Sequence, residues 1–248
     1  MLRRLFKTIG ATIVWCIVLS VLWVLVLGVL PPPVTWLMAE QAGVQKSFAR
    51  SWQDLHRISA YMPLAVVASE DQKFMEHNGF DWAAIDKAME YNERKKGKRF
   101  RGASTISQQV AKNVFLWSGR TWIRKGAEVW FTLLIEVLWS KERIIEVYLN
   151  VAETGPGRFG VEAAAEACFG RPASRLTREQ AAAIAVVIPS PRKYSCSDPG
   201  PKTRTRAAWV IRNMNNLGDV FDPAVRARNA EAERAREERK ARRRAKRK

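Results

Sequence analysis

The sequence predicts a mainly α-helical domain that follows one membrane-spanning helix. Residues 9–30 form an apolar stretch of 22 residues without a charged side chain, which is long enough as a helix to cross the roughly 30 Å hydrocarbon layer of a bilayer. From residue 34 to residue 220, hydrophobic side chains recur with helical spacing, and runs with strict two-residue alternation are nearly absent. The 248 residues therefore suit one domain of ordinary size behind an anchor.

The residues that flank the apolar stretch predict its orientation. Arg3, Arg4 and Lys7 precede it, and three prolines at positions 31–33 follow it. Because positive flanks stay in the cytoplasm, we expect residues 1–8 to be cytoplasmic and the domain to lie on the other side. A cleaved signal peptide is the competing interpretation, but its apolar part would span only about 7–15 residues.

Eight segments after the anchor have the spacing of helices that bury one face. We expect the domain to span residues 31–220 and a basic tail, residues 221–248, to follow it. Between the second and third segments, residues 92–103 carry six basic side chains without an apolar repeat, and a solvated mobile linker and an anion-binding loop are equal alternatives there. The eight segments are residues 37–60, 80–92, 104–117, 122–139, 141–151, 160–168, 176–188 and 202–217.

The charge of the chain indicates an anionic partner. Its formal net charge is +18, from 42 Lys and Arg against 24 Asp and Glu, and such an excess says nothing about the fold. Residues 224–248 hold 12 Lys or Arg and 4 Glu, so this tail cannot supply a core. We expect a frayed tail, with a single charged helix as the alternative, attracted to anionic lipid or wall polymer.

The cysteines and histidines exclude two classes of small domain. Three cysteines, Cys16, Cys168 and Cys196, cannot form a disulfide framework, and with only two histidines the usual zinc-binding sets are not available. Cys16 lies within the apolar stretch. For Cys168 and Cys196 we expect two independent thiols, with pairing as the alternative.

The first group of reactive side chains is Glu70 and Asp71, which follow the apolar residues 64–68. A carboxylate partly withdrawn from water has a raised pKa and accepts a proton more readily, as general-base catalysis on a sugar hydroxyl requires. The structural alternative is an acidic pair that caps a helix or bridges to Lys73. His77 has the features of a hydrogen-bonded turn histidine.

The second group begins at Ser104, which is predicted to cap a helix at its N-terminus. The spacing of Ser104, Gln108 and Lys112 places these three side chains along one helix face. More cations follow, and large apolar residues such as Trp117 and Trp122 stand among them. This mixture suits the headgroup level of a membrane, although core aromatics beside solvated cations are the alternative. The later cations are Arg120, Arg124 and Lys125.

The third group lies on a segment, residues 126–139, that is apolar nearly all round. Glu128, Thr132 and Glu136 recur at every fourth position and make one polar stripe. A carboxylate on a buried helix needs a partner or a function, because an unpaired buried charge is costly. A pair between Glu128 and Arg124 is the structural alternative.

Four motifs stand in order along the chain. They are Glu70-Asp71-x-x-Phe74-x-x-His77-x-Gly79, Gly102-x-Ser104-Thr105-Ile106-x-Gln108-Gln109-x-x-Lys112-Asn113, Arg124-Lys125-x-x-Glu128, and Lys141-x-x-Ile144-Ile145-x-x-Tyr148-Leu149-Asn150. Together they resemble the serial motifs of the peptidoglycan glycosyltransferases, the lysozyme-like family 51 type, over residues 32–217. A fifth stretch, from Gly160 to Ala185, is also similar, with Cys168 where that family more often has tyrosine. The resemblance implies a two-lobed, lysozyme-like helical domain.

The resemblance implies that the chain polymerises lipid II. The growing glycan on undecaprenyl diphosphate would be the donor, the 4-hydroxyl of the incoming GlcNAc the acceptor, and a β-1,4 bond the product. By the same resemblance, Glu70 would be the general base. Glu128 would be the second carboxylate, assisting departure of the diphosphate directly or through a divalent cation.

The remaining site residues follow from the same resemblance. Fixed cations would stabilise the leaving diphosphate, and polar side chains would hold sugar or phosphate oxygens. The resemblance is compatible with a divalent cation, Mg²⁺ or Mn²⁺, next to Asp71, and no organic cofactor is expected. The expected cations are Lys112, Arg120, Arg124 and Lys125, and the expected polar residues are Ser104, Gln108 and Gln109.

The resemblance also sets the expected compartment and partners. We expect a single-pass protein of the bacterial inner membrane with a periplasmic catalytic domain, whose partners are lipid II, the nascent glycan strand, the bilayer and other wall-synthesis proteins, without nucleic acid. Residues 190–193 match the S-x-x-K spacing of transpeptidases by chance, because no S-D-N or K-T-G follows. A monofunctional glycosyltransferase is therefore expected.

Two other classes of protein remain as alternatives. A lytic, lysozyme-like hydrolase also uses an acidic residue in a helical lobe, but it has no reason to hold Lys112, Arg120 and Arg124 next to the site. A non-catalytic membrane scaffold would bind anionic lipid through the basic loop and tail, and deletion of residues 224–248 should then abolish its function.

Overall fold

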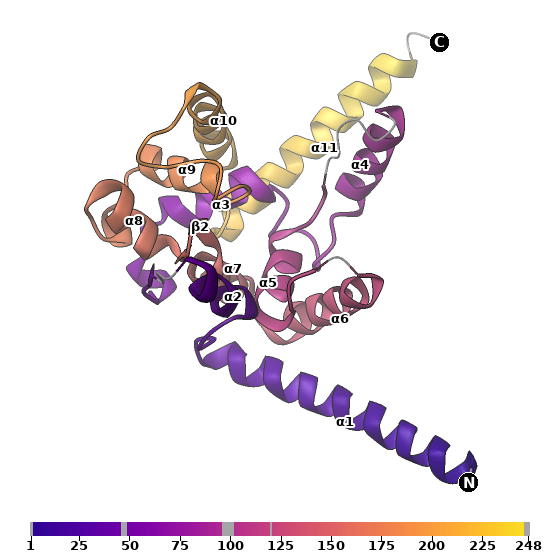
Figure 1. The fold of residues 1–248 in the computed structure, drawn as a ribbon. Coiled ribbons are helices and arrows are strands. Elements are labelled where there is room, and N and C mark those ends of the chain that lie inside the picture. The colour runs from indigo at the N-terminus through magenta and orange to yellow at the C-terminus, as the bar shows by residue number, and fades with distance from the viewer. Residues whose placement is uncertain (1, 46–48, 96–101, 120, 246–248) are drawn as a thin grey trace.

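The computed structural model describes residues 2–45, 49–95, 102–119 and 121–245 (Figure 1). Most of these residues are helical, which confirms the predicted fold class. The helices are α1 Leu2–Val29, α2 Trp36–Gln45, α3 Tyr61–Glu70, α4 Trp82–Arg94, α5 Ile106–Phe115, α6 Trp122–Leu138, α7 Lys141–Val151, α8 Val161–Phe169, α9 Arg178–Val187, α10 Pro201–Leu217 and α11 Pro223–Ala245. Two 3₁₀ turns cover Leu55–Arg57 and Ala173–Arg175.

The helices form two lobes joined by α7. In one lobe α3, α9 and α10 pack against one another, and in the other α5 packs against α6. Helix α7 contacts α5 and α6 on one side and α3 and α8 on the other. Its residues 144–151 are buried with the exception of Glu146, so α7 forms the centre of a continuous core (Figure 1).

A small sheet covers one end of the core. Strand β3 (Arg158–Phe159) lies in the middle, parallel to β1 (Ala49–Arg50) and antiparallel to β2 (Glu153–Gly155). The three strands are short, which explains why the two-residue alternation of strands was not visible in the sequence.

The prediction of one helix over residues 37–60 is wrong from Ala49 onward. The chain there forms β1 and a 3₁₀ turn, because side chains of α7 bind its backbone. The Asn150 amide accepts a hydrogen bond from Gln53 N and donates one to Gln53 O, both at 2.8 Å, and the Glu146 carboxylate accepts one from Leu55 N at 2.8 Å. These contacts between distant segments replace the hydrogen bonds of a helix.

Helix α3 was not predicted, because it has no polar face. Residues 62–69 are all buried, so the segment lacks the periodicity that marks a surface helix. The start of α5 also differs from the prediction. Thr105, and not Ser104, is the N-cap, and Thr105 and Gln108 form a reciprocal capping box.

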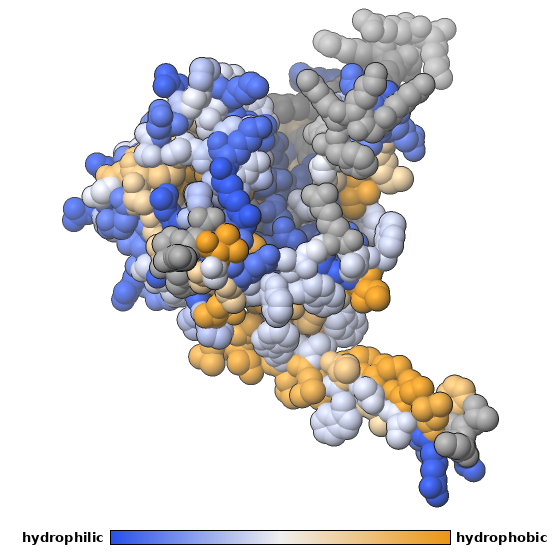
Figure 2. All heavy atoms as spheres, viewed as in Figure 1, coloured by the Kyte–Doolittle hydropathy of each residue, from blue (hydrophilic) through white to orange (hydrophobic). Residues whose placement is uncertain are grey.

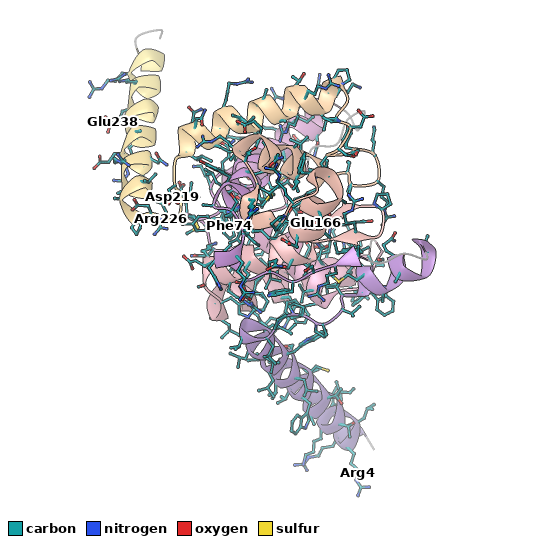
Figure 3. All side chains as sticks on the ribbon, turned by 90° about the vertical axis from the view of Figure 1, so that its left-hand side faces the viewer. Arg4, Phe74, Glu166, Asp219, Arg226 and Glu238 are labelled. Carbon is teal, nitrogen blue, oxygen red and sulfur yellow. A yellow bond between two sulfur atoms is a disulfide. The ribbon has the colours of Figure 1, made fainter. Side chains whose placement is uncertain are left out.

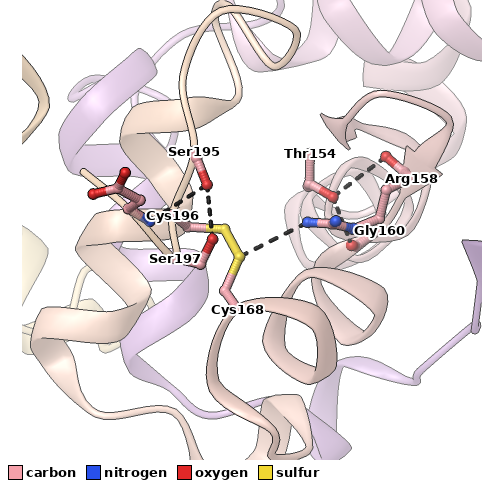
Figure 4. Close-up of a disulfide and its surroundings, with 8 residues drawn as sticks. Thr154, Arg158, Gly160, Cys168, Ser195, Cys196 and Ser197 are labelled. Atoms are coloured by element: carbon pink, nitrogen blue, oxygen red, sulfur yellow. Dashed lines mark hydrogen bonds between the residues drawn. A yellow bond between two sulfur atoms is a disulfide. The ribbon is translucent and has the colours of Figure 1, made fainter. Parts of the chain in front are cut away.

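Cys168 and Cys196 form a disulfide, so the prediction of two independent thiols is wrong. The bond joins the end of α8 to the loop between α9 and α10, with the two Cα atoms 5.8 Å apart (Figure 4). The two residues are 28 positions apart in the sequence, and only the packing of α8 beside α9 brings them within bonding range. Cys16 is a free, exposed cysteine of α1.

Helix α1 is long and apolar enough over Arg3–Val29 to cross a membrane, as predicted. Its far end, at Arg4, projects from the body, whereas α11 stands clear of the body at another side (Figures 1 and 3). The described part of the tail is thus one charged helix, in agreement with the alternative to a frayed tail. Apolar surface gathers on α1 and the adjoining part of the body (Figure 2).

Candidate active site

A cleft of about 430 Å³ opens beside the end of α3. Residues 69–73 form one wall. Residues 102–105, which precede α5, and the helices α4 and α10 form the others. A second hollow, of about 300 Å³, lies beside the C-terminal half of α5 and is lined by Lys112 and Arg124 among others. The two hollows lie at opposite ends of α5, and the predicted site residues are distributed between them.

Glu70 is the last residue of α3 and lines the cleft. Its Oε1 accepts a hydrogen bond from Ser69 Oγ at 3.3 Å, and its Oε2 accepts one from Gln109 Nε2 at 3.2 Å. Burial raises the pKa of the Glu70 carboxyl, and these two hydrogen bonds and the charge of Arg206 oppose the shift only in part. Glu70 is therefore a half-buried carboxylate with an increased affinity for a proton, in contact with a cleft.

Tyr148 of α7 fixes the orientation of Gln109. Its hydroxyl donates a hydrogen bond to Gln109 Oε1 at 3.2 Å, which leaves the amide NH₂ group to face Glu70. Burial raises the pKa of the Tyr148 phenol well above its ordinary value, and the negative charge of Glu70 adds to the shift. The phenol therefore stays protonated and remains a donor. Tyr148 occurs in the motifs quoted above, but the sequence did not indicate this contact.

Glu128 lies on α6 and is 4% exposed. One carboxylate oxygen pairs with Arg124 Nη1 at 3.2 Å and the other with Lys125 Nζ at 2.5 Å. The predicted pair between Glu128 and Arg124 is present, and a second cation joins it. Because each carboxylate oxygen has a cationic partner, Glu128 holds two positive side chains in fixed positions.

Lys112 of α5 adds a third cation to this group. Although Lys112 is exposed to solvent, protein atoms crowded around it lower the pKa of its ammonium group. Glu128 opposes this shift, and Arg124 and Lys125 reinforce it. Lys112 and Arg124 line the same hollow, and Arg124 pairs with Glu128, so Lys112 lies close to the Glu128 group.

Helix α5 connects the two carboxylates. Gln109 binds Glu70, and Lys112 lines the second hollow together with Arg124, the partner of Glu128. Residues three positions apart are neighbours on one helix face, with about 5–6 Å between their Cβ atoms. The structure therefore brings Glu70 and Glu128 to the same face of α5, although they are 58 positions apart in the sequence.

Asp71 and His77 hold the start of α5 in place. His77 Nε2 lies 3.0 Å from both carboxylate oxygens of Asp71, and Asp71 Oδ2 also accepts a hydrogen bond from Ile106 N at 3.0 Å. Since Gly79 N donates to His77 Nδ1 at 3.1 Å, the hydrogen bonds assign the ring proton to Nε2. Asp71, which lines the cleft, therefore binds both His77 and the first residue of α5, and the hydrogen-bonded turn histidine expected at position 77 is confirmed.

Gly79 must be a glycine at this position. Its φ is +89°, and a Cβ atom there would lie 2.7 Å from Thr132 Cγ2, which is closer than real Cβ contacts. The Gly79 carbonyl accepts a hydrogen bond from Thr105 Oγ1 at 2.6 Å. The turn that contains Gly79 is therefore pressed between α6 and the N-terminus of α5.

The polar stripe of α6 faces this network. Thr132 is fully buried and donates to Glu128 O at 2.6 Å. Glu136 accepts a hydrogen bond from Ser107 Oγ and pairs with Lys141 Nζ at 2.8 Å, and Lys141 Nζ also donates to His77 O at 2.6 Å. Of the three stripe residues, only Glu128 is surrounded by cations of the second hollow.

The other predicted site residues have different surroundings. Ser104 is exposed and lines the cleft next to Thr105. Gln108 is buried, and its Oε1 accepts a hydrogen bond from Thr105 N at 3.0 Å, so its side chain stabilises the start of α5. Arg120 lies outside the described residues, as do residues 96–101 of the basic loop.

Arg206 of α10 is a residue of the cleft that sequence reasoning missed. Its guanidinium donates to Ser69 O at 3.1 Å and lies 4.0 Å from the centroid of the Trp209 ring. Both residues line the cleft beside Glu70. No local signal in the sequence marks Arg206, because it is one of several basic residues on α10.

The described donors do not fit a divalent cation held by protein side chains. In residues 2–45, 49–95, 102–119 and 121–245, no group of three or more His, Cys, Asp or Glu lies close enough to hold one. Both oxygens of Asp71 bind His77, and both oxygens of Glu128 bind cations.

Comparison with known proteins identifies the family of the chain. Residues 38–215 match the family model described as Transglycosylase. Proteins named "Biosynthetic peptidoglycan transglycosylase" are similar along most of their length. The one from Pseudomonas aeruginosa is 52% identical over 224 residues, which cover 88% of this chain and 96% of that protein. The one from Pseudomonas putida strain W619 is 51% identical, with 88% and 94% covered, and the one from Xanthomonas campestris pv. campestris strain B100 is 50% identical, with 80% and 83% covered. The chain therefore belongs to the transglycosylase family.

Proposed function

We propose that this chain polymerises lipid II into linear glycan strands of peptidoglycan by inverting glycosyl transfer, without transpeptidase activity. Membership of the transglycosylase family and the names of the similar proteins support this activity. The observation that carries the mechanism is the pair Glu70 and Glu128 on one face of α5, with a base at one end and cations at the other.

Glu70 would act as the general base. It would take the proton of the GlcNAc 4-hydroxyl while the oxygen attacks C1 of the donor sugar. The C1–oxygen bond to undecaprenyl diphosphate breaks at the same time, and its electron pair leaves with the diphosphate. The raised pKa of Glu70 makes it a better proton acceptor at neutral pH than an ordinary carboxylate.

The cations in the second hollow, Lys112 and Arg124, and the adjacent Lys125 would bind the leaving diphosphate. Lys112, Arg124 and Lys125 surround one carboxylate, Glu128, so positive charge exceeds negative charge there. Fixed cations stabilise the charge that develops on the leaving group more than they stabilise the bound donor. In this proposal Glu128 acts by orienting Arg124 and Lys125, and Arg120 remains a further candidate for diphosphate binding.

The polar residues that line the cleft would position the sugars. Gln109 already binds Glu70, and Ser104 is exposed at the cleft, so both suit contact with sugar oxygens. Gln108 has a different role in this proposal, because its side chain is part of the capping box. It would maintain the start of α5 without contact to the substrate.

We further propose that α1 anchors the chain in the bacterial inner membrane with the domain in the periplasm. The basic residues before α1 indicate a cytoplasmic N-terminus. The disulfide between Cys168 and Cys196 supports an oxidising compartment for the domain. Exposed Trp117 and Trp122, near the second hollow, suit the headgroup level at which a lipid-linked diphosphate lies. Other wall-synthesis proteins would be partners in the same compartment.

The test is lipid II polymerisation by the purified full chain and by Glu70→Gln. We expect the substitution to reduce the rate by about 10²-fold or more and to leave the unfolding temperature no lower than that of the wild type. Glu166→Gln, at an exposed position of α8, is the matched control and should retain full activity. Full activity of Glu70→Gln would refute the role of Glu70, and release of soluble fragments from finished cell wall would indicate the lytic hydrolase.

A further inference from the structure

The end of α1 and the segment that follows it, residues 27–33, are bound by the catalytic domain at several points. Arg143 of α7 donates through Nη2 to the carbonyls of Leu27, at 2.8 Å, and Leu30, at 2.7 Å, and through Nε to Leu27 O at 3.3 Å. The last carbonyls of a helix have no partner within the helix. Arg143 therefore caps the C-terminus of α1 from the catalytic domain.

A second arginine holds the proline segment that follows. Arg50 of β1 donates through Nη2 to Pro32 O at 2.6 Å and through Nη1 to Pro33 O. Prolines have a fixed φ, so residues 31–33 are stiff before any contact is made. With their carbonyls bound by Arg50, these residues have little freedom to act as a flexible linker.

Two tryptophans lie between and beside the arginines. The guanidinium carbon of Arg50 lies 5.6 Å from the centroid of the Trp52 ring, and that of Arg143 lies 5.4 Å from it. Arg143 is also 6.0 Å from the centroid of Trp139. The four side chains alternate as Arg50, Trp52, Arg143 and Trp139, and we name this set the joint. Glu146 pairs with Arg143 and also accepts from Leu55 N at 2.8 Å, which ties the joint to the domain.

Helix α1 also contacts the joint along its last two turns. Trp139 Nε1 donates to Val24 O at 2.8 Å. A Cβ atom on Gly28 would lie 3.0 Å from Trp139 Nε1, so a larger residue there would require the indole to shift by a few tenths of an ångström. One turn earlier, Trp130 Nε1 of α6 donates to Ser20 Oγ at 3.1 Å.

The same helix packs against the two elements that carry the site. Trp23 of α1 lies edge-on to Phe115 of α5 and Phe131 of α6, with ring centroids 5.2 Å and 6.1 Å apart. Helix α5 carries Lys112, and Phe131 follows Glu128 by three positions on α6. A change in the position of α1 would therefore act on the helices that form the second hollow.

We propose that the joint fixes the depth and tilt of the active-site cleft relative to the bilayer, so that α1 is a positioning element of the enzyme as well as an anchor. This inference rests on the proposed function, in which both substrates are lipid-linked and their diphosphates stay at one depth. A misplacement of about 1 Å can reduce a rate about 10²-fold, so a freely pivoting anchor would present the cleft to its substrate only part of the time. Arg50 and Arg143 are positioning residues in this account.

The test measures geometry and activity separately, with the full chain in lipid vesicles. Spin labels on the native Cys16 of α1 and on Cys introduced by Asn216→Cys, at an exposed position of α10, report the distance between the anchor and the domain. We expect a narrow distance distribution for the chain with an intact joint and a broad one for Arg143→Ala. Arg57→Ala, at an exposed arginine of a 3₁₀ turn, is the matched control and should keep the narrow distribution.

Activity supplies the second measurement. Arg143→Ala should polymerise bilayer-embedded lipid II at least about tenfold more slowly, while its rate in detergent, where substrate and enzyme orient freely, stays within about twofold. Trp139→Phe, which removes the hydrogen bond to Val24 O and reduces the ring contacts with Arg143 and Gly28, should show the same pattern more weakly. This second variant keeps the test decisive if Arg143→Ala does not fold. A narrow distribution in both variants, or equal losses in detergent and bilayer, would overturn the inference. Failure of the wild type to polymerise lipid II in either medium would instead refute the proposed function, and the distance measurement would still decide whether the joint is rigid.

Discussion

Removal of the disulfide between Cys168 and Cys196 should lower the stability of the domain by a predictable amount. The bond joins residues 28 positions apart. In the chain-entropy model, closing a loop of this length in the unfolded state contributes about 3.5 kcal/mol. For a domain of this size, about 1 kcal/mol corresponds to roughly 2–4 °C in the unfolding temperature. We therefore expect Cys168→Ser with Cys196→Ser to lower the unfolding temperature by about 7–14 °C.

The assay is thermal unfolding of the full chain in detergent, with and without a reductant. Cys16→Ser, which alters the free cysteine, is the control and should behave as the wild type in both conditions. Reductant should lower the unfolding temperature of the wild type towards that of the double variant and leave the double variant unchanged. If titration of free thiols shows that the bond is reduced while the unfolding temperature does not change, the reasoning is refuted.

Three further predictions concern Glu70 of the cleft and two residues, Gly79 and Tyr148, that support the site. Because burial raises the pKa of Glu70, the acid limb of the pH–rate profile should lie above the pKa of an ordinary glutamate. For the same reason, Glu70→Gln should unfold at a higher temperature than the wild type at neutral pH, and this difference should disappear in acid. Gly79→Ala should destabilise the domain by about 2–5 kcal/mol in denaturant titrations, because φ is +89° and the new Cβ meets Thr132. Tyr148→Phe, which frees the Gln109 amide to rotate, should reduce polymerisation of lipid II without loss of fold.

Each of these predictions has a result that contradicts it. The sign of the first follows from the raised pKa, since a carboxyl that binds protons more tightly when folded contributes stability at low pH and loses it as the pH rises through its folded pKa. Equal stability of Glu70→Gln and the wild type at all pH values would contradict it. Gly43→Ala, at a glycine with no atom within 4 Å of the new Cβ, is the control for Gly79→Ala, and equal stability of the two would contradict the steric argument. A fully active Tyr148→Phe would show that Gln109 needs no fixed orientation.

Periodicity and spacing predicted those parts of the molecule that depend on local sequence. The polar stripe at Glu128, Thr132 and Glu136 was visible because one helix face differs from the others. The apolar anchor was visible because of its length. Helix α3 was not predicted as a helix, since burial on every side removes the contrast between faces.

Contacts between distant segments account for the features that sequence reasoning missed. The hydrogen bonds of Asn150 to Gln53 replace a predicted helix with an extended segment. The disulfide, the contact of Arg206 with Ser69 O, and the contact of Arg143 with Leu27 O each join residues more than 25 positions apart. Such pairs leave no periodic signal in one sequence, so only the folded chain reveals them.

The central claim is that Glu70 and Glu128 work together along one face of α5, the first as base and the second as holder of the diphosphate-binding cations. The most direct measurement is the pH dependence of lipid II turnover by the wild type, Glu70→Gln and Glu128→Gln. We predict that Glu70→Gln reduces the rate at saturating substrate and removes the acid limb from the residual activity, whereas Glu128→Gln reduces the rate and keeps that limb. Turnover at the wild-type rate in either variant, or an unchanged acid limb in the residual activity of Glu70→Gln, would contradict the claim.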